Sequence, residues 1–147
     1  MVNLTNLLAT VLASTTVVSA EYLAVIEHQM QSWNGGRNAF CQNTAPLFKI
    51  ESFTSHPGPV GSGCSWKGKH VATSNKKNGS QMEGCKGGYT GGWSVCITSY
   101  GANVHNGKGQ HQRCNKDDTQ LLACPTPICW NTSTRKLKCQ GVWHKDA

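Results

Sequence analysis

Eight cysteines constrain this chain more than any other feature of its sequence. Their number is even, and none lies within the first twenty residues. In an oxidising compartment such a set is typical of a disulfide framework, in which each bond contributes about 2–4 kcal/mol by restricting the unfolded chain. We therefore expect four disulfides, whose pairing the sequence leaves open. The cysteines expected to form them are Cys41, Cys64, Cys85, Cys96, Cys114, Cys124, Cys129 and Cys139.

The N-terminal segment favours export through the secretory pathway, which is oxidising. Residues 7–18 are apolar apart from Thr and Ser, and the small residues Ser19 and Ala20 follow them. This pattern is typical of a secretory signal peptide and its cleavage site. The apolar stretch is too short to span a bilayer comfortably. We expect residues 1–20 to be a signal peptide and residues 21–147 to be a single secreted cysteine-rich domain, extracellular and without stable membrane insertion.

The apolar content predicts a thin core. Apolar residues make up 37% of the whole chain, and the first twenty residues hold a disproportionate share of them. Ordering each residue costs on the order of 1–2 kcal/mol of backbone entropy, and a small domain buries little apolar surface against that cost. We expect a small β-rich domain stabilised by its disulfides, all-β or α+β, with an antiparallel sheet and long loops.

Alternation of apolar and polar residues predicts the strands. Phe48 and Ile50 alternate with Lys49 and Glu51, which indicates a half-buried strand over residues 46–53. Residues 93–100 alternate most regularly. In the first half of the chain we also expect a strand followed by a short helical or irregular stretch over 21–33, and a short strand within 64–73. A loop or hairpin is expected over 101–114. Three short strands are expected over 119–124, 127–131 and 137–143, and a turn at 131–135 would join the last two.

Two N-x-[ST] triplets lie in predicted surface turns. They begin at Asn78 and Asn131. In a secreted chain this triplet is the acceptor for N-linked glycans. We therefore expect a glycoprotein modified at one or both of these residues.

The sequence contains no strong catalytic motif. There is no G-x-S-x-G segment for a serine nucleophile, and no thiol remains if all eight cysteines pair. Asp117 and Asp118 are adjacent in what we predict to be a solvated turn. We therefore expect no catalytic residue and no enzyme. The strongest enzymatic alternative is a small secreted ribonuclease, for which the residue types are supplied by His105, His111, Arg113, Glu83 and Lys108, although their spacing does not indicate that they converge.

Metal binding is a less favoured interpretation of the residues between His105 and Cys114. His105, His111 and Cys114 could approach a metal ion, but the chain has no C-x-x-C pair, and its cysteines are expected to form disulfides. We expect no metal site and no cofactor.

The formal net charge of +7 has several interpretations. Such a field can steer a protein to anionic lipid, wall polysaccharide or nucleic acid, although more often it keeps a small extracellular domain soluble. Among the five tryptophans, we expect Trp93 and Trp130 to pack on disulfides. Exposed contacts for a partner are expected from Trp33, Trp66 or Trp143, with the loops at 54–64 and 101–113 facing the partner.

These features together resemble a class of proteins. The segment W-N-G-G-R-x-x-x-C over 33–41, and Cys129-Trp130 followed by C-x-x-x-W over 139–143, resemble the small secreted cysteine-rich effectors of plant-associated fungi. The resemblance is to a class, and no functional residue is carried over from it. It implies interference with host defence, in some members with recognition by a host resistance protein as an avirulence determinant.

We therefore expect a non-enzymatic virulence effector. Its expected partner is a host protein, either a plant defence component or an immune receptor, met in the apoplast or after entry into host cells. We expect a monomer without a nucleic-acid partner. The alternatives are a cationic antimicrobial or killer-type toxin, for which the sequence shows no continuous amphipathic cationic stretch, and the ribonuclease.

Overall fold

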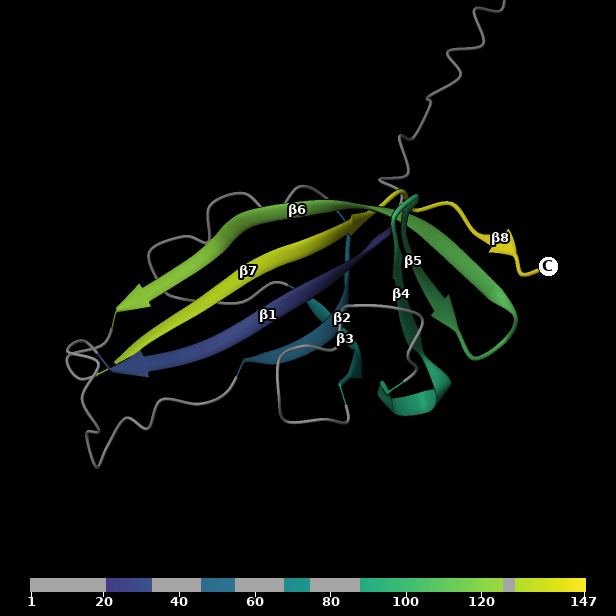
Figure 1. Cartoon of the computed structure of the whole chain (residues 1–147). Helices are drawn as coiled ribbons and strands as arrows, with labels where there is room; N and C mark the ends of the chain where they lie inside the picture. The colour runs from purple at the N-terminus through teal and green to yellow at the C-terminus, as the bar shows by residue number, and fades with distance from the viewer. Residues whose placement is uncertain (1–20, 33–45, 55–67, 75–87, 126–128) are drawn as a thin grey trace, which may run out of the picture.

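The computed structural model describes residues 21–32, 46–54, 68–74, 88–125 and 129–147. Its strands form one antiparallel sheet in the order β3-β2-β1-β7-β6-β5-β4, with β8 added beside β6 (Figure 1). The prediction of a β-rich antiparallel domain is confirmed. The elements are β1 (Tyr22–Ser32), β2 (Leu47–Phe53), β3 (Lys69–Thr73), the 3₁₀ turn η1 (Thr90–Gly92), β4 (Ser94–Thr98), β5 (Gly101–Asn106), β6 (Gln110–Pro125), β7 (Cys129–Cys139) and β8 (His144–Lys145).

The sheet curls around its main core. The end of β3 meets the segment that leads into β4, because Ser74 bridges Tyr89 and the Thr73 N–H donates to Thr90 Oγ1 at 3.1 Å. The two edge strands of the sheet are thereby brought together. The concave face encloses a cluster to which every strand from β1 to β7 contributes, formed by Leu23, Val25, Phe48, Ile50, Ala72, Tyr89, Val95, Ala102, Val104, Cys114, Leu137 and Cys139.

A second cluster lies on the opposite face of β1 and β2. It consists of Tyr22, Ala24, Ile26 and Phe53, with Leu121 of β6 packed against it. β1 is therefore buried on both faces, which explains its run of consecutive apolar residues. The predicted strand over 46–53 is confirmed. Glu51, however, is only 3% exposed, because the face expected to meet solvent is covered.

Other strand boundaries differ from expectation. β1 continues to Ser32 as one strand, so the predicted helical or irregular stretch is wrong up to that residue. β6 is a single strand of 16 residues that includes the polar segment predicted as a turn. Register shifts at Lys116/Thr119 and Gln120/Leu122 let it follow β7 through that segment. The short strand predicted within 64–73 is found at Lys69–Thr73, and the strand predicted over 93–100 and the hairpin within 101–114 are confirmed.

The turn predicted at 131–135 is wrong. β7 runs unbroken through it, paired with β1 on one side and β6 on the other. Asn131 therefore lies in a central strand and is half-buried, and its glycosylation stays a prediction. Asn78 and the predicted signal peptide lie outside the described residues.

The described cysteines are all disulfide-bonded. One bond joins Cys114 of β6 to Cys139 of β7. Cys96, Cys124 and Cys129 are also in disulfides. Cys41, Cys64 and Cys85 lie outside the described residues. No helix in the described ranges is long and apolar enough to cross a membrane.

Candidate functional site

Three histidines lie side by side on the outer face of the sheet. His105 of β5 is the direct cross-strand partner of His111 of β6, and His111 is in turn the partner of His144 of β8. The neighbours Val104 and Gln112 are buried, so alternation along the strands turns all three imidazoles outward. The ring centroids of His105 and His111 lie 5.1 Å apart, and those of His111 and His144 lie 5.4 Å apart. We call these three residues the histidine row.

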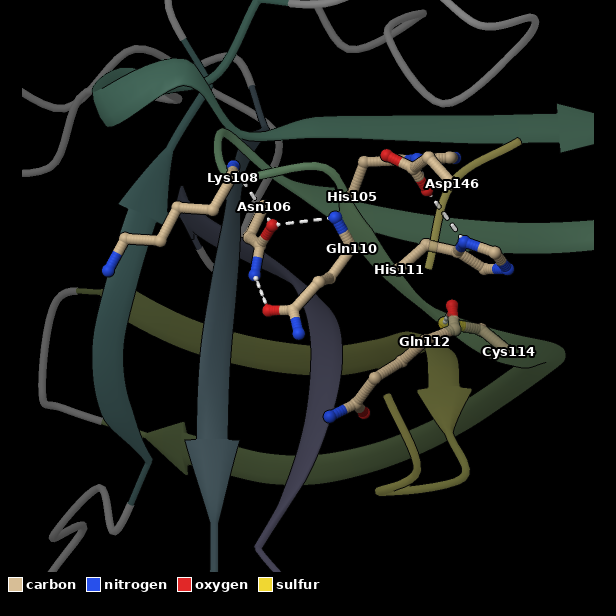
Figure 2. A network of polar contacts seen from close by, with 8 residues as sticks. All are labelled: His105, Asn106, Lys108, Gln110, His111, Gln112, Cys114 and Asp146. Carbon is tan, nitrogen blue, oxygen red and sulfur yellow. Dashed lines mark hydrogen bonds and ion pairs between the residues drawn. The ribbon is translucent and has the colours of Figure 1, made fainter. Parts of the chain in front are cut away.

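One carboxylate binds two members of the row. Asp146 Oδ1 lies 3.1 Å from His105 Nδ1 and 2.7 Å from His111 Nδ1 (Figure 2). Because a carboxylate can only accept, both Nδ1 atoms carry the proton, and the lone pair of each neutral ring is on Nε2. The hydrogen bond from His111, with a further hydrogen bond from His105, holds the pKa of Asp146 below its usual value despite the opposing effect of desolvation.

The backbone fixes this carboxylate in place. The Asp146 N–H donates to the Gly109 carbonyl oxygen at 2.9 Å, directly after the β6–β8 ladder. Gly109 closes the β5–β6 turn with a φ of 78°, a conformation that favours glycine. The short β8 strand is thereby tied to the tip of the hairpin that carries His105 and His111.

The β5–β6 turn is itself braced from within. Asn106 Oδ1 accepts from the N–H groups of Lys108 and Gln110, each at 3.0 Å, and Asn106 Nδ2 donates to Gln110 Oε1 at 3.1 Å (Figure 2). The turn also packs closely on η1, since a Cβ on Gly107 would lie 3.2 Å from the carbonyl oxygen of Gly91. The row is therefore held by strands and a rigid turn.

Apolar side chains adjoin the histidine row. Val142 and Trp143 directly precede His144 and are exposed, Trp143 by 41%. The Trp143 ring lies 6.1 Å from that of Trp93, which is half-buried against the core. The expectation that Trp143 is exposed is confirmed. Trp33 and Trp66 lie outside the described residues.

Of the residues that the sequence suggested for catalysis or metal binding, two lie side by side and the others do not join them. His105 and His111 meet, but Cys114 faces the core within a disulfide and is no metal ligand. Arg113 is exposed on the same face of β6 as His111, and Lys108 is exposed in the turn. Glu83 lies outside the described residues.

Asp117 and Asp118 do not converge either. They lie in β6 rather than in a turn, and each pairs with a different cation: Asp117 with Arg135 at 2.7 Å and Asp118 with Lys136 at 2.9 Å. Paired carboxylate chemistry requires two carboxylates that face one substrate. These two acids are instead partners of basic residues on β7.

A second polar cluster lies on the other long strands. His28 Nδ1 is 2.7 Å from Ser133 Oγ, and His28 Nε2 is 3.3 Å from Glu51 Oε2. With the Nε2–H donating to the carboxylate, the serine hydroxyl donates to Nδ1. Serine hydrolases use a serine, a histidine and a carboxylate for catalysis. Here Ser133 and Glu51 are both buried, so a substrate in solvent would not reach the serine. The cluster therefore serves as a polar link among β7, β1 and β2.

Sequence reasoning missed Asp146 and His144 as partners of the predicted histidines. Asp146 is 35 residues from His111 along the chain, and only the pairing of β8 with β6 brings them together. Two imidazoles that share a carboxylate can exchange protons, bind an anion when protonated, or hold a metal ion. The chain matches no known family model, no curated protein and no solved structure.

Proposed function

We propose that this protein is a secreted, non-enzymatic effector that binds a host protein through Val142, Trp143 and the adjoining histidine row. The observation that carries the proposal is the 41% exposure of Trp143 on a segment anchored at both ends. Exposed aromatic side chains on rigid supports are frequent energetic centres of protein interfaces. A large aromatic ring whose orientation is fixed before the partner binds loses little conformational entropy on binding.

The anchoring of this segment supports that role. Before Trp143, the Gly141 N–H donates to the buried Gln112 Oε1 at 3.2 Å, and after it His144 and Lys145 pair with β6. The Trp143 ring is also supported by Trp93. The exposed Lys145 follows Trp143 by two residues, so an acidic partner surface would suit this segment.

The secretory and disease-related parts of the proposal rest on the sequence. The predicted signal peptide and the cysteine framework favour an extracellular protein. The resemblance to cysteine-rich fungal effectors adds the host plant as the place of action and defence as the process affected. Recognition as an avirulence determinant belongs to the same proposal.

The test applies the oxidised mature protein to plant leaves of several genotypes and, in parallel, to bacterial and fungal cultures. We expect leaf cell death or suppressed defence that depends on the genotype, with microbial growth unchanged. Trp143→Ala should abolish the leaf response. Tyr100→Ala is the matched control, because Tyr100 is a fully exposed aromatic residue in the β4–β5 turn, away from the row.

Two results would contradict the proposal. Microbial killing with silent leaves would favour the cationic toxin. An equal loss of the leaf response in both variants would show that Trp143 has no special part in it. Circular dichroism of both variants would confirm that they are folded.

The meeting of His105 and His111 favours ribonuclease activity as a second candidate. Their rings lie 5.1 Å apart, with Arg113 exposed on the same face. One neutral imidazole could accept the proton of the ribose 2′-hydroxyl while the other, protonated, donates to the leaving oxygen. His105→Ala or His111→Ala should then abolish RNA degradation, and His70→Ala, on the distant β3, should not. A wild-type protein inert toward RNA would eliminate this candidate.

A further inference from the structure

We propose that His105, His111 and Asp146 bind a divalent transition-metal ion, with zinc or copper the best match. The three side chains offer one ligand atom each, and these atoms all lie within 4.8 Å of one another. Two imidazoles and one carboxylate are ligands that suit zinc, copper and nickel. The site goes beyond the proposed host contact, with which it shares His105 and His111, and the zinc titration below tests it without reference to that contact.

The distances already approach those of a metal site. Zinc binds imidazole nitrogen and carboxylate oxygen at about 2.0–2.2 Å, so tetrahedral geometry places neighbouring ligand atoms roughly 3.3–3.6 Å apart. Asp146 Oδ1 lies 3.1 Å from His105 Nδ1 and 2.7 Å from His111 Nδ1. An ion between these atoms therefore requires Oδ1 to lie about 0.2–0.5 Å farther from His105 Nδ1 and about 0.6–0.9 Å farther from His111 Nδ1.

The scaffold holds the ligands in advance. His105 and His111 are direct partners in the β5–β6 ladder, and the backbone of Asp146 is tied to Gly109. A pre-formed ligand set loses little conformational entropy when the ion binds. Ligands from neighbouring strands of one sheet are also held more precisely than ligands from separate loops.

The site is accessible, and one coordination position remains available. The side chains of His105, His111 and Asp146 are 28%, 17% and 32% exposed, so an ion reaches them from solvent. Three protein ligands leave a fourth position for water or for another side chain. His144, stacked against His111 at 5.4 Å, is the nearest further imidazole in the row.

Two effects oppose binding and set its expected strength. Each imidazole must change tautomer, so that its proton moves from Nδ1 to Nε2, and the exposed cation Arg113 lies on the same face of β6 as His111. Replacing two hydrogen bonds to one carboxylate by three coordinate bonds outweighs these effects for the late transition metals. Magnesium and calcium, which require several oxygen ligands, should not bind here.

The experiment is a calorimetric titration of the oxidised mature protein with zinc. We expect saturation at one zinc ion per chain. Cobalt(II) should give the visible absorption of a tetrahedral nitrogen and oxygen site. His111→Gln and Asp146→Asn should each weaken zinc binding at least about tenfold. His70→Gln on β3 is the matched control and should bind as the wild type does.

Three outcomes of the zinc titrations would overturn the proposal. They are the absence of saturable zinc binding, equal weakening in the His70 control, and wild-type affinity in both site variants. Near-ultraviolet circular dichroism and thermal melts without metal would establish that each variant is folded. Magnesium that binds as tightly as zinc would also contradict the site.

Discussion

Cys114 and Cys139 lie directly opposite each other on β6 and β7 and are joined by a disulfide. Both sulfur atoms are buried in the core cluster on the concave face. The bond lies just before the chain leaves β7 for the segment that carries Trp143 and Asp146. It therefore fastens the base of the candidate site to the core of the sheet.

Removing this bond should destabilise the domain. The variant Cys114→Ala/Cys139→Ala should lose about 2–4 kcal/mol of unfolding free energy, because the crosslink no longer restricts the unfolded chain. Urea denaturation without reductant measures the difference. Full reduction of the wild type should go further and abolish the cooperative melt at moderate temperature. A reduced protein that melts close to the oxidised one would show that the apolar core alone is sufficient.

Gln112 is a buried amide whose acceptor atom serves two backbone groups. Its side chain is 1% exposed, and Oε1 accepts from the N–H groups of Leu23 at 3.4 Å and Gly141 at 3.2 Å. Gln112→Met keeps the volume but leaves both donors without this acceptor, so it should cost about 1–3 kcal/mol. Gln120→Met on the exposed part of β6 is the control and should change the unfolding free energy by less than about 0.5 kcal/mol. Equal losses would contradict the role of Gln112.

The sequence predicted the strands with clear alternation and missed those built from polar residues. Residues 46–53 and 93–100 alternate, and strands were found in both. Residues 115–120 are polar and carry few β-branched side chains, yet they belong to β6, because β7 supplies a pairing edge and the outer face meets solvent. Pairing between distant strands overrode local propensity there.

The candidate site was only half predictable. His105 and His111 were identified as chemically suited residues from their type alone. Their convergence depends on the β5–β6 register, and the part of Asp146 depends on β8 returning to the start of β6. Neither the register nor the return leaves a local signal in the sequence. Likewise, Glu51 was expected to face solvent, because nothing in a strand's own sequence indicates a second covered face.

Tyr89 carries a buried hydroxyl that finds no hydrogen-bond partner among the described residues. Burial strongly raises the pKa of this phenol, as expected for a group removed from water. Tyr89→Phe removes the desolvated hydroxyl and keeps the ring, so it should leave stability unchanged or raise it by up to about 1 kcal/mol. Thermal denaturation tests this. Tyr22→Phe is the control, because Tyr22 Oη accepts from Arg135 at 3.5 Å, and it should not raise the melting temperature. A clear loss in Tyr89→Phe would contradict the assignment.

Asp117 should make a larger contribution to stability than its neighbour Asp118. Burial alone would raise the pKa of Asp117, but hydrogen bonds from Thr119 and Arg135 and the charge of Arg135 outweigh it, so the pKa lies below its usual value. The Asp117 side chain is 18% exposed and that of Asp118 is 80% exposed. We expect Asp117→Asn to cost about 1–3 kcal/mol and Asp118→Asn less than about 0.5 kcal/mol.

The pH dependence of stability separates this pair further. A carboxyl with a lowered pKa in the folded state stabilises the fold fully above its ordinary value of 3.8, and that contribution is lost as the pH falls through the lower folded-state pKa. Urea unfolding between pH 2 and 6 should therefore show a shallower acid loss in Asp117→Asn than in the wild type. Asp118→Asn should follow the wild-type curve. Parallel curves for all three proteins would mean that the Asp117–Arg135 pair contributes nothing to acid stability.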